Sequence, residues 1–152
     1  MAQQVHRGSA SRPVADVMST DLVTVHPEAT IADVARLMRD HDIGPVVVVD
    51  DESVFGIVTD RDIVVRAVAD GQDAEATPVG DVASTSVTTI DPEDTLEVAA
   101  EAMRSQAVRR VVVTERGRPL GILSLGDLAQ TEDAADEAGA ALGDVSAAPP
   151  QD

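Results

Sequence analysis

The sequence predicts an α/β (α+β) fold built from two tandem copies of one β-α-β-β-α unit, and three observations predict it. The chain matches itself at a separation of 65 residues, beginning at Pro13 and again at Pro78. Its apolar residues are nearly all Val, Ala, Ile and Leu, with Phe55 as the one aromatic residue. Each copy combines the hydrophobic periods of strands and helices. The 152 residues suffice for one compact domain or for two half-domains that share a core.

The internal repeat keeps one register from end to end, which we interpret as a duplication. Matching pairs are Pro13-Val14-Ala15-Asp16-Val17 with Pro78-Val79-Gly80-Asp81-Val82, Pro27 with Pro92, Met38 with Met103, residues 46–48 with 111–113, and Gly56 with Gly121. The predicted organisation is a flexible leader at 1–12, the first repeat at 13–71, a linker at 72–77, the second repeat at 78–130 and a tail at 131–152. The tail is acidic and rich in Ala, Gly and Pro, which predicts disorder.

The first half of each copy reads as a short strand followed by a helix. Residues 22–25 form a β-branched run, and Pro27 separates it from a helix that we expect Thr30 to cap, with Asp33 completing a capping box. Apolar residues then recur at helical spacing. They are Ile31, Val34, Ala35 and Met38 in the first copy, and Leu96, Ala99, Ala100 and Met103 in the second.

The second half of each copy reads as a hairpin followed by another helix. Residues 46–49 form a continuous apolar run, typical of a strand buried on both faces, and Asp50-Asp51-Glu52 supplies the turn into residues 55–58. A helix should begin near Asp60 and end at Ala69, with Gly71 as the stop. Neither copy is large enough to bury its sheet alone, so we expect the two copies to pack face to face.

Composition excludes several classes of function. A formal net charge of −17 opposes binding to nucleic acid and to anionic membranes. The absence of cysteine and the presence of only three scattered histidines argue against a metal site. No apolar run reaches the ~18 residues that span a bilayer, and the polar start lacks the apolar stretch of a signal peptide, so we expect a cytoplasmic protein.

The duplicated turn motifs resemble those of one family. Gly-Ile-Val-Thr-Asp-Arg-Asp at 56–62 and Gly-Ile-Leu-Ser-Leu-Gly-Asp at 121–127 resemble the Gly-h-h-Thr/Ser-x-x-Asp signature of the CBS (cystathionine β-synthase) domain family, where h is hydrophobic. The resemblance covers roughly residues 13–130 and is closest to stand-alone two-repeat proteins. It implies a Bateman module with two clefts that bind AMP, ADP, ATP, S-adenosylmethionine or NAD. It also implies regulation without catalysis, a homodimer, and an unidentified regulated protein.

The resemblance assigns the ribose of the ligand to the two acidic turns. A carboxylate where a strand gives way to a helix can accept hydrogen bonds from two vicinal hydroxyls, and a nearby hydroxyl can bond ribose or phosphate. The residues in these roles are Thr59 and Asp62 in the first copy, and Ser124 and Asp127 in the second. The alternative is that they only cap and complement helix N-termini.

The resemblance assigns the phosphates to arginine. The family places Arg109 and Arg110 at the start of a core strand facing the cleft of the other repeat, so that either would meet the phosphates of a ligand held by Asp62, with help from Arg61. The first copy has Gly44 and Pro45 at the matching positions, which predicts two unequal sites. The alternative is that both arginines form surface ion pairs.

The rest of the predicted cleft is aliphatic. Adenine is expected on residues 18–23 and 83–88, without stacking on Tyr or Trp because the chain has neither. His41-Asp42 is adjacent in sequence at the end of a helix and supplies no nucleophile with its base, so we predict no enzyme. The remaining alternative is a ligand-free module for protein interaction or dimerisation.

Overall fold

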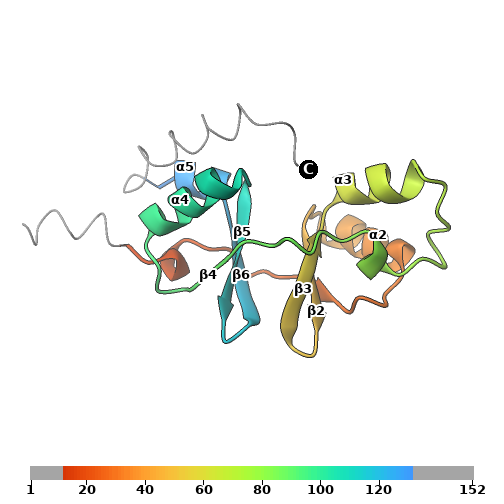
Figure 1. Ribbon diagram of the computed structural model, residues 1–152, viewed down its shortest axis with the longest axis horizontal. Helices are drawn as coiled ribbons and strands as arrows, with labels where there is room; N and C mark the ends of the chain where they lie inside the picture. Colours follow the sequence, from red (N-terminus) through yellow and green to blue (C-terminus); the bar gives the residue numbers. More distant parts are fainter. Residues whose placement is uncertain (1–11, 132–152) are drawn as a thin grey trace, which may run out of the picture. The chain divides into compact units, whose positions relative to one another are not determined.

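Two three-stranded sheets organise the chain, with strand orders β1-β2-β3 and β4-β5-β6 (Figure 1). The computed structural model describes residues 12–131. The predicted leader and tail lie outside the described residues, apart from Arg12 and Thr131. Both copies follow the predicted order of strand, helix, two strands and helix, so the α+β fold is confirmed.

The first copy begins with a single 3-10 turn before its first strand. Its elements are η1 (Val14–Asp16), β1 (Thr24–Val25), α2 (Ile31–His41), β2 (Val46–Asp50), β3 (Ser53–Val58), α3 (Asp60–Ile63) and η2 (Val64–Val68). Strand β1 pairs parallel with β2, and β2 pairs antiparallel with β3. The predicted hairpin is therefore present, and its first strand is buried as the apolar run indicated.

The second copy repeats this arrangement. Its elements are η3 (Val79–Asp81), β4 (Thr89–Ile90), α4 (Leu96–Gln106), β5 (Arg110–Glu115), β6 (Arg118–Ser124) and α5 (Leu125–Ala129). Strand β4 pairs parallel with β5, and the central pairings Thr24–Val47 and Thr89–Val112 match each other at the repeat distance. The duplicated sequence therefore gives a duplicated sheet register.

The two long helices are capped alike, with one difference from the prediction. Thr30 Oγ1 accepts a hydrogen bond from Asp33 N at 3.1 Å, and Thr95 caps α4 in the same way. Asp33 does not complete the predicted capping box, because its carboxylate accepts a hydrogen bond from Arg36 at 3.1 Å. The hydroxyl alone therefore caps α2.

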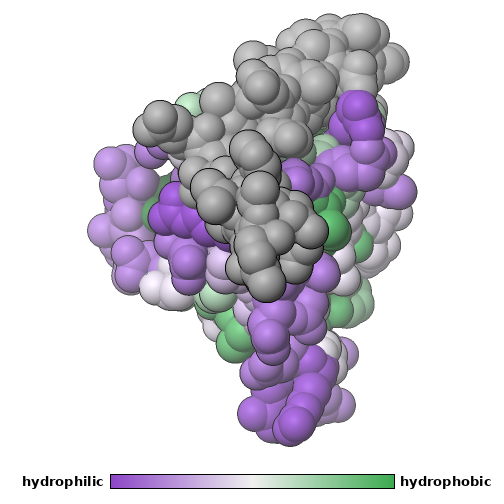
Figure 2. All heavy atoms as spheres, turned by 90° about the vertical axis from the view of Figure 1, so that its left-hand side faces the viewer, coloured by the Kyte–Doolittle hydropathy of each residue, from purple (hydrophilic) through white to green (hydrophobic). Residues whose placement is uncertain are grey.

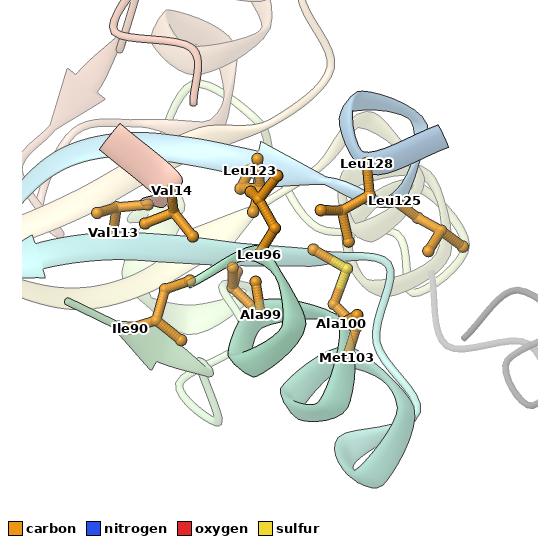
Figure 3. Packing of buried hydrophobic residues seen from close by; sticks show 11 residues of the cluster. Val14, Ile90, Leu96, Ala99, Ala100, Met103, Val113, Leu123, Leu125 and Leu128 are labelled. Carbon is orange, nitrogen blue, oxygen red and sulfur yellow. The ribbon is translucent and has the colours of Figure 1, made fainter. Parts of the chain in front are cut away.

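The apolar face of α2 is narrower than predicted. Ile31, Val34 and Met38 are buried, but Ala35 is exposed. The matching residue in α4, Ala100, is buried in a cluster that also contains Leu125 and Leu128 (Figure 3). The first copy has Asp60 in place of Leu125, and Asp60 is exposed, so less apolar surface is available to cover Ala35.

The second helix of the first copy changes type along its length. The prediction was a regular helix from Asp60 to Ala69, but only α3 is α-helical and η2 is a π-helix. Ala69 N donates to Val64 O at 2.9 Å, a bond that spans five residues. Three valines of η2 are exposed, at 57% for Val64, 49% for Val65 and 66% for Val68. Gly71 follows with φ of +70°, as expected of a stop.

The segment that precedes the first strand of each repeat, here called its lead-in, comprises residues 12–21 in the first repeat and 78–87 in the second. Each lead-in belongs to the compact unit of the other repeat. Unit 1 contains described residues 12–21, 88–116 and 120–131, and unit 2 contains residues 22–87 and 117–119. Ser19 exchanges backbone hydrogen bonds with Ile122 at 2.9 and 3.0 Å, and Ser84 does the same with Ile57 at 2.8 and 2.9 Å. Each unit therefore contains the β-α-β-β-α body of one repeat, apart from hairpin residues 117–119, and the lead-in of its sister repeat.

Glycine permits these close crossings. A Cβ on Gly56 would lie 2.5 Å from Ser84 O, and a Cβ on Gly121 would lie 2.7 Å from Ser19 O. Any side chain would force the lead-in segment away from the strand. The first Gly of the duplicated signature is therefore a packing requirement of the exchange.

Two aliphatic clusters form the cores. The core of unit 1 joins Val14 of the lead-in to Leu96, Met103, Val113 and Leu123 (Figure 3). In unit 2, Val79 takes the place of Val14. Phe55, which is partly buried, packs against the unit 2 core. The described surface visible in Figure 2 is largely hydrophilic, in keeping with the acidic composition.

Candidate functional site

The first acidic turn joins β3 to α3 in unit 2. Thr59 Oγ1 accepts a hydrogen bond from Asp62 N at 3.2 Å, and Asp62 Oδ2 accepts one from Thr59 N at 2.9 Å. This is a reciprocal capping box. Both residues are buried, at 7% and 8% exposure, so the carboxylate does not face bulk water. Thr59 and Asp62 therefore cap α3, and the cap occupies one of the two carboxylate oxygens of Asp62.

The second acidic turn joins β6 to α5 in unit 1 and has the same design. Ser124 Oγ accepts from Asp127 N at 3.1 Å, and Asp127 Oδ2 accepts from Ser124 N at 2.8 Å. Both residues are partly buried. Thr131 Oγ1 donates to the backbone oxygen of Asp127 at 3.0 Å. The local geometry of the signature is therefore the same in both copies.

The cap leaves Oδ1 of each aspartate as the oxygen for a further partner. In unit 2, Asp62 Oδ1 lies 4.0 Å from Arg66 Nε. Arg66 Nη1 also donates to Val82 O at 3.2 Å, which ties the guanidinium to the lead-in of the second repeat. Sequence reasoning missed Arg66, although its spacing of four residues from Asp62 within a helix was a signal for an ion pair.

The lead-in segments predicted to carry adenine lie beside the strands that end in the acidic turns. Ser84 pairs with Ile57, two residues before Thr59, and Ser19 pairs with Ile122, two residues before Ser124. In each unit the predicted adenine segment and the predicted ribose-binding turn therefore belong to neighbouring backbone.

The structure divides the other predicted site residues between the units. Arg109 O accepts a hydrogen bond from Leu125 N at 2.8 Å, so this residue's backbone lies at the start of α5 in unit 1. Arg110 opens β5 and is partly buried. Gly44 and Pro45 precede β2 in unit 2, and Arg61 lies exposed in α3. The pairing of Arg109 and Arg110 with a ligand held by Asp62 relates the two units and stays a prediction.

The described residues supply no other recognisable centre. Between residues 12 and 131, no three His, Cys, Asp or Glu side chains group closely enough to hold a metal ion. His41 is the last residue of α2, and Asp42 is its left-handed C-cap, which gives this pair a structural role. In the same part of the chain, no helix combines the length and apolarity needed to cross a membrane.

Comparison with known proteins agrees with the duplicated signature. The family model described as CBS domain matches residues 14–68 and 79–132. The CBS domain-containing protein YhcV of Bacillus subtilis is 38% identical over 133 residues, covering 88% of this chain and 94% of the relative. Hypoxic response protein 1 of Mycobacterium tuberculosis is 33% identical over 116 residues, covering 76% and 81%.

Solved structures show the same fold. Hypoxic Response Protein I, solved with two coordinated zinc ions, aligns with a TM-score of 0.70 and 32% identity, covering 78% of this chain and 97% of that one. The CBS domain protein PAE2072 from Pyrobaculum aerophilum, complexed with AMP, aligns with a TM-score of 0.73 and 29% identity, covering 84% and 98%.

Proposed function

Since this chain belongs to the CBS domain family, we propose that it is a non-catalytic regulatory module that binds an adenine nucleotide or a related adenosyl ligand. Proteins of this family are generally regulatory, and paired CBS repeats commonly bind adenosyl ligands. The candidate ligands are AMP, ADP, ATP, S-adenosylmethionine and NAD. The relative PAE2072, with AMP in its structure, supports AMP as the first to test.

The proposal rests on one observation: in each acidic turn the capping hydrogen bond engages Oδ2 of the aspartate and leaves Oδ1 available. Oδ2 of Asp62 and of Asp127 is held by the capping box, which fixes the side chain before any ligand arrives. Oδ1 can then accept hydrogen bonds from the vicinal hydroxyls of a ribose. Because the carboxylate is already ordered, little side-chain entropy is lost on binding.

The remaining groups have proposed roles that follow from their chemistry. Thr59 and Ser124 offer a hydroxyl beside each carboxylate, and the Ser84 and Ser19 segments offer backbone groups for adenine. Arg61, Arg109 and Arg110 are proposed to contact phosphates. Gly44 and Pro45 stand where the second repeat has its arginine pair, so we propose that the two sites differ in affinity for charged ligands.

Titration calorimetry with AMP tests the ribose assignment. In Asp62→Asn and Asp127→Asn the amide oxygen can still accept the capping N–H, but an NH₂ group replaces the free acceptor oxygen. Each variant should lose one binding event, weakened on the order of tenfold or more. Asp33→Asn, at an exposed carboxylate in the first turn of α2, is the matched control. A double variant that binds AMP like the wild type would refute the assignment.

A thermal-shift panel of the five candidates tests ligand binding itself. A ligand of the folded state adds about 2.7 kcal/mol of stability when its free concentration is ~100 times Kd. At least one compound should therefore raise Tm clearly. If none does, the module functions without a ligand, as an interaction or dimerisation domain.

The exposed valines of η2 specifically favour an interaction role in addition to ligand binding. The exposed residues are Val64, Val65 and Val68, which lie within five residues of one helical segment. Clustered exposure of apolar side chains is typical of contact surfaces. We propose that this segment contacts a second copy of the chain. Sedimentation of Val65→Asp against the wild type tests self-association: an unchanged mass would exclude a second copy at this surface.

A further inference from the structure

Arg66 occupies a place at the Asp62 turn that no other described residue shares. Its Nε lies 4.0 Å from Asp62 Oδ1, the oxygen that the cap leaves available, and its Nη1 donates to Val82 O at 3.2 Å. The arginine side chain is 49% exposed and the aspartate side chain 11%. The guanidinium thus reaches from solvent to a buried carboxylate that we propose binds ribose, and the inference rests on that proposal.

The second repeat has no such cation. The residue at the position of Arg66 is Thr131, which is buried and donates to the backbone oxygen of Asp127 in α5. The segment from 125 to 131 contains no Arg or Lys at all, whereas the matching segment of the first repeat contains Arg61 and Arg66. The difference is specific to the surroundings, because the capping boxes themselves are the same.

Charge decides what such a site can accept. A bare carboxylate repels an approaching phosphate, and the repulsion is stronger at a protein surface than in bulk water because the effective dielectric constant is lower. A guanidinium beside the carboxylate cancels this repulsion. It also carries more N–H donors than its two described contacts use, and a phosphate oxygen is a strong acceptor for them.

We propose that Arg66 is the specificity-determining residue of the Asp62 site, and that it selects a phosphorylated nucleotide over the corresponding unphosphorylated nucleoside. The ribose is held by Asp62 in either case. Arg66 adds an interaction that only the phosphate can make, so its loss should change discrimination between ligands more than affinity for the nucleoside.

The test compares AMP with adenosine by titration calorimetry in an Asp127→Asn background, where the Asp62 site is observed alone. Arg66→Thr, which installs the residue of the second repeat, should weaken AMP binding on the order of tenfold and leave adenosine binding within about twofold. Arg66→Lys should restore part of the preference, because it keeps the charge but not the planar fork. Added salt should weaken AMP binding more in the background protein than in Arg66→Thr.

Two further variants separate selectivity from folding. Arg66→Gln removes the charge but keeps an NH₂ donor for Val82 O, so it reports on charge if Arg66→Thr does not fold. Arg39→Thr is the control. It removes an exposed arginine that hydrogen-bonds Asp40 at 2.8 Å, and it should leave the affinities for AMP and for adenosine unchanged.

The outcomes separate this inference from the proposed function. An unchanged ratio of AMP to adenosine affinity in both Arg66→Thr and Arg66→Gln would overturn the selectivity role and leave ribose binding by Asp62 intact. Equal weakening of both ligands would also overturn it, since that is the result of a purely structural role. Failure of the wild type to bind either ligand would overturn the proposed function and this inference together.

Discussion

The turns at Thr59–Asp62 and Ser124–Asp127 have the same internal bonds, but their surroundings differ. In both, a hydroxyl and a carboxylate form a reciprocal capping box between a strand and a short helix. Around it, the first repeat is charged and the second is apolar or neutral. The positions that differ in charge are Asp60 against Leu125, Arg61 against Gly126 and Arg66 against Thr131. Duplication thus kept the carboxylate geometry and changed the electrostatics, which separates the requirement for folding from the selection of a ligand.

The apolar cores beside the two turns differ in the same way as the turns do. Leu125 is buried with Leu128 in the core of unit 1, whereas Asp60 is exposed in unit 2 and leaves Ala35 uncovered. The second repeat has the larger core at this end, and the first repeat has the more polar site.

The largest loss of stability is expected from truncating a buried residue in each core, which compares the two cores directly. Leu123 and Val58 are the fully buried residues just before the two capping turns. Leu123→Ala should lower the free energy of unfolding by about 3 kcal/mol, and Val58→Ala by less, because the smaller side chain leaves a smaller cavity. Urea unfolding measures both. Equal losses would mean that the two cores do not differ in this way.

Removing the capping hydroxyls should lower the free energy of unfolding by a smaller amount, and by the same amount in the two repeats. Thr59→Ala, measured against Thr59→Ser so that the lost methyl group does not contribute, and Ser124→Ala, measured against the wild type, each leave a backbone N–H of the helix without its side-chain acceptor, at a cost of about 1 kcal/mol. The distances, 3.2 and 3.1 Å, give no reason for the two losses to differ. Chemical denaturation of the two variants side by side is the measurement. A clear inequality would break the claim that the turns are locally equivalent.

Substitutions at the hairpin tips should change the free energy of unfolding least. The change should be an increase in the first repeat and a decrease in the second. Glu52 has φ of 69° and its counterpart Gly117 has φ of 83°, a region that favours glycine. Glu52→Gly should raise the free energy of unfolding by up to about 1 kcal/mol, and Gly117→Ala should lower it by about as much. The Glu52–Arg118 ion pair is exposed on both sides, so its loss offsets little. Destabilisation by Glu52→Gly would contradict this reasoning.

Local pattern explains why much of the molecule could be predicted. The hairpins, the cap at Thr30 and the stop at Gly71 depend on residues a few positions apart, and each occurs as expected. The π-helix at η2 was missed because its sequence has the same hydrophobic spacing as an α-helix. The incomplete capping box at Asp33 was missed because a third residue, Arg36, competes for the carboxylate.

By itself the sequence determined the duplication, the order of elements and the two acidic turns, because all of these follow from neighbours along the chain. Only the tertiary structure decided that the lead-in segments exchange between the compact units and that Arg66 joins Asp62 to Val82. Both depend on which distant segments pack together. Since the two repeats offer nearly the same apolar surfaces, the pattern of one repeat does not reveal whether its lead-in packs on its own body or on its sister.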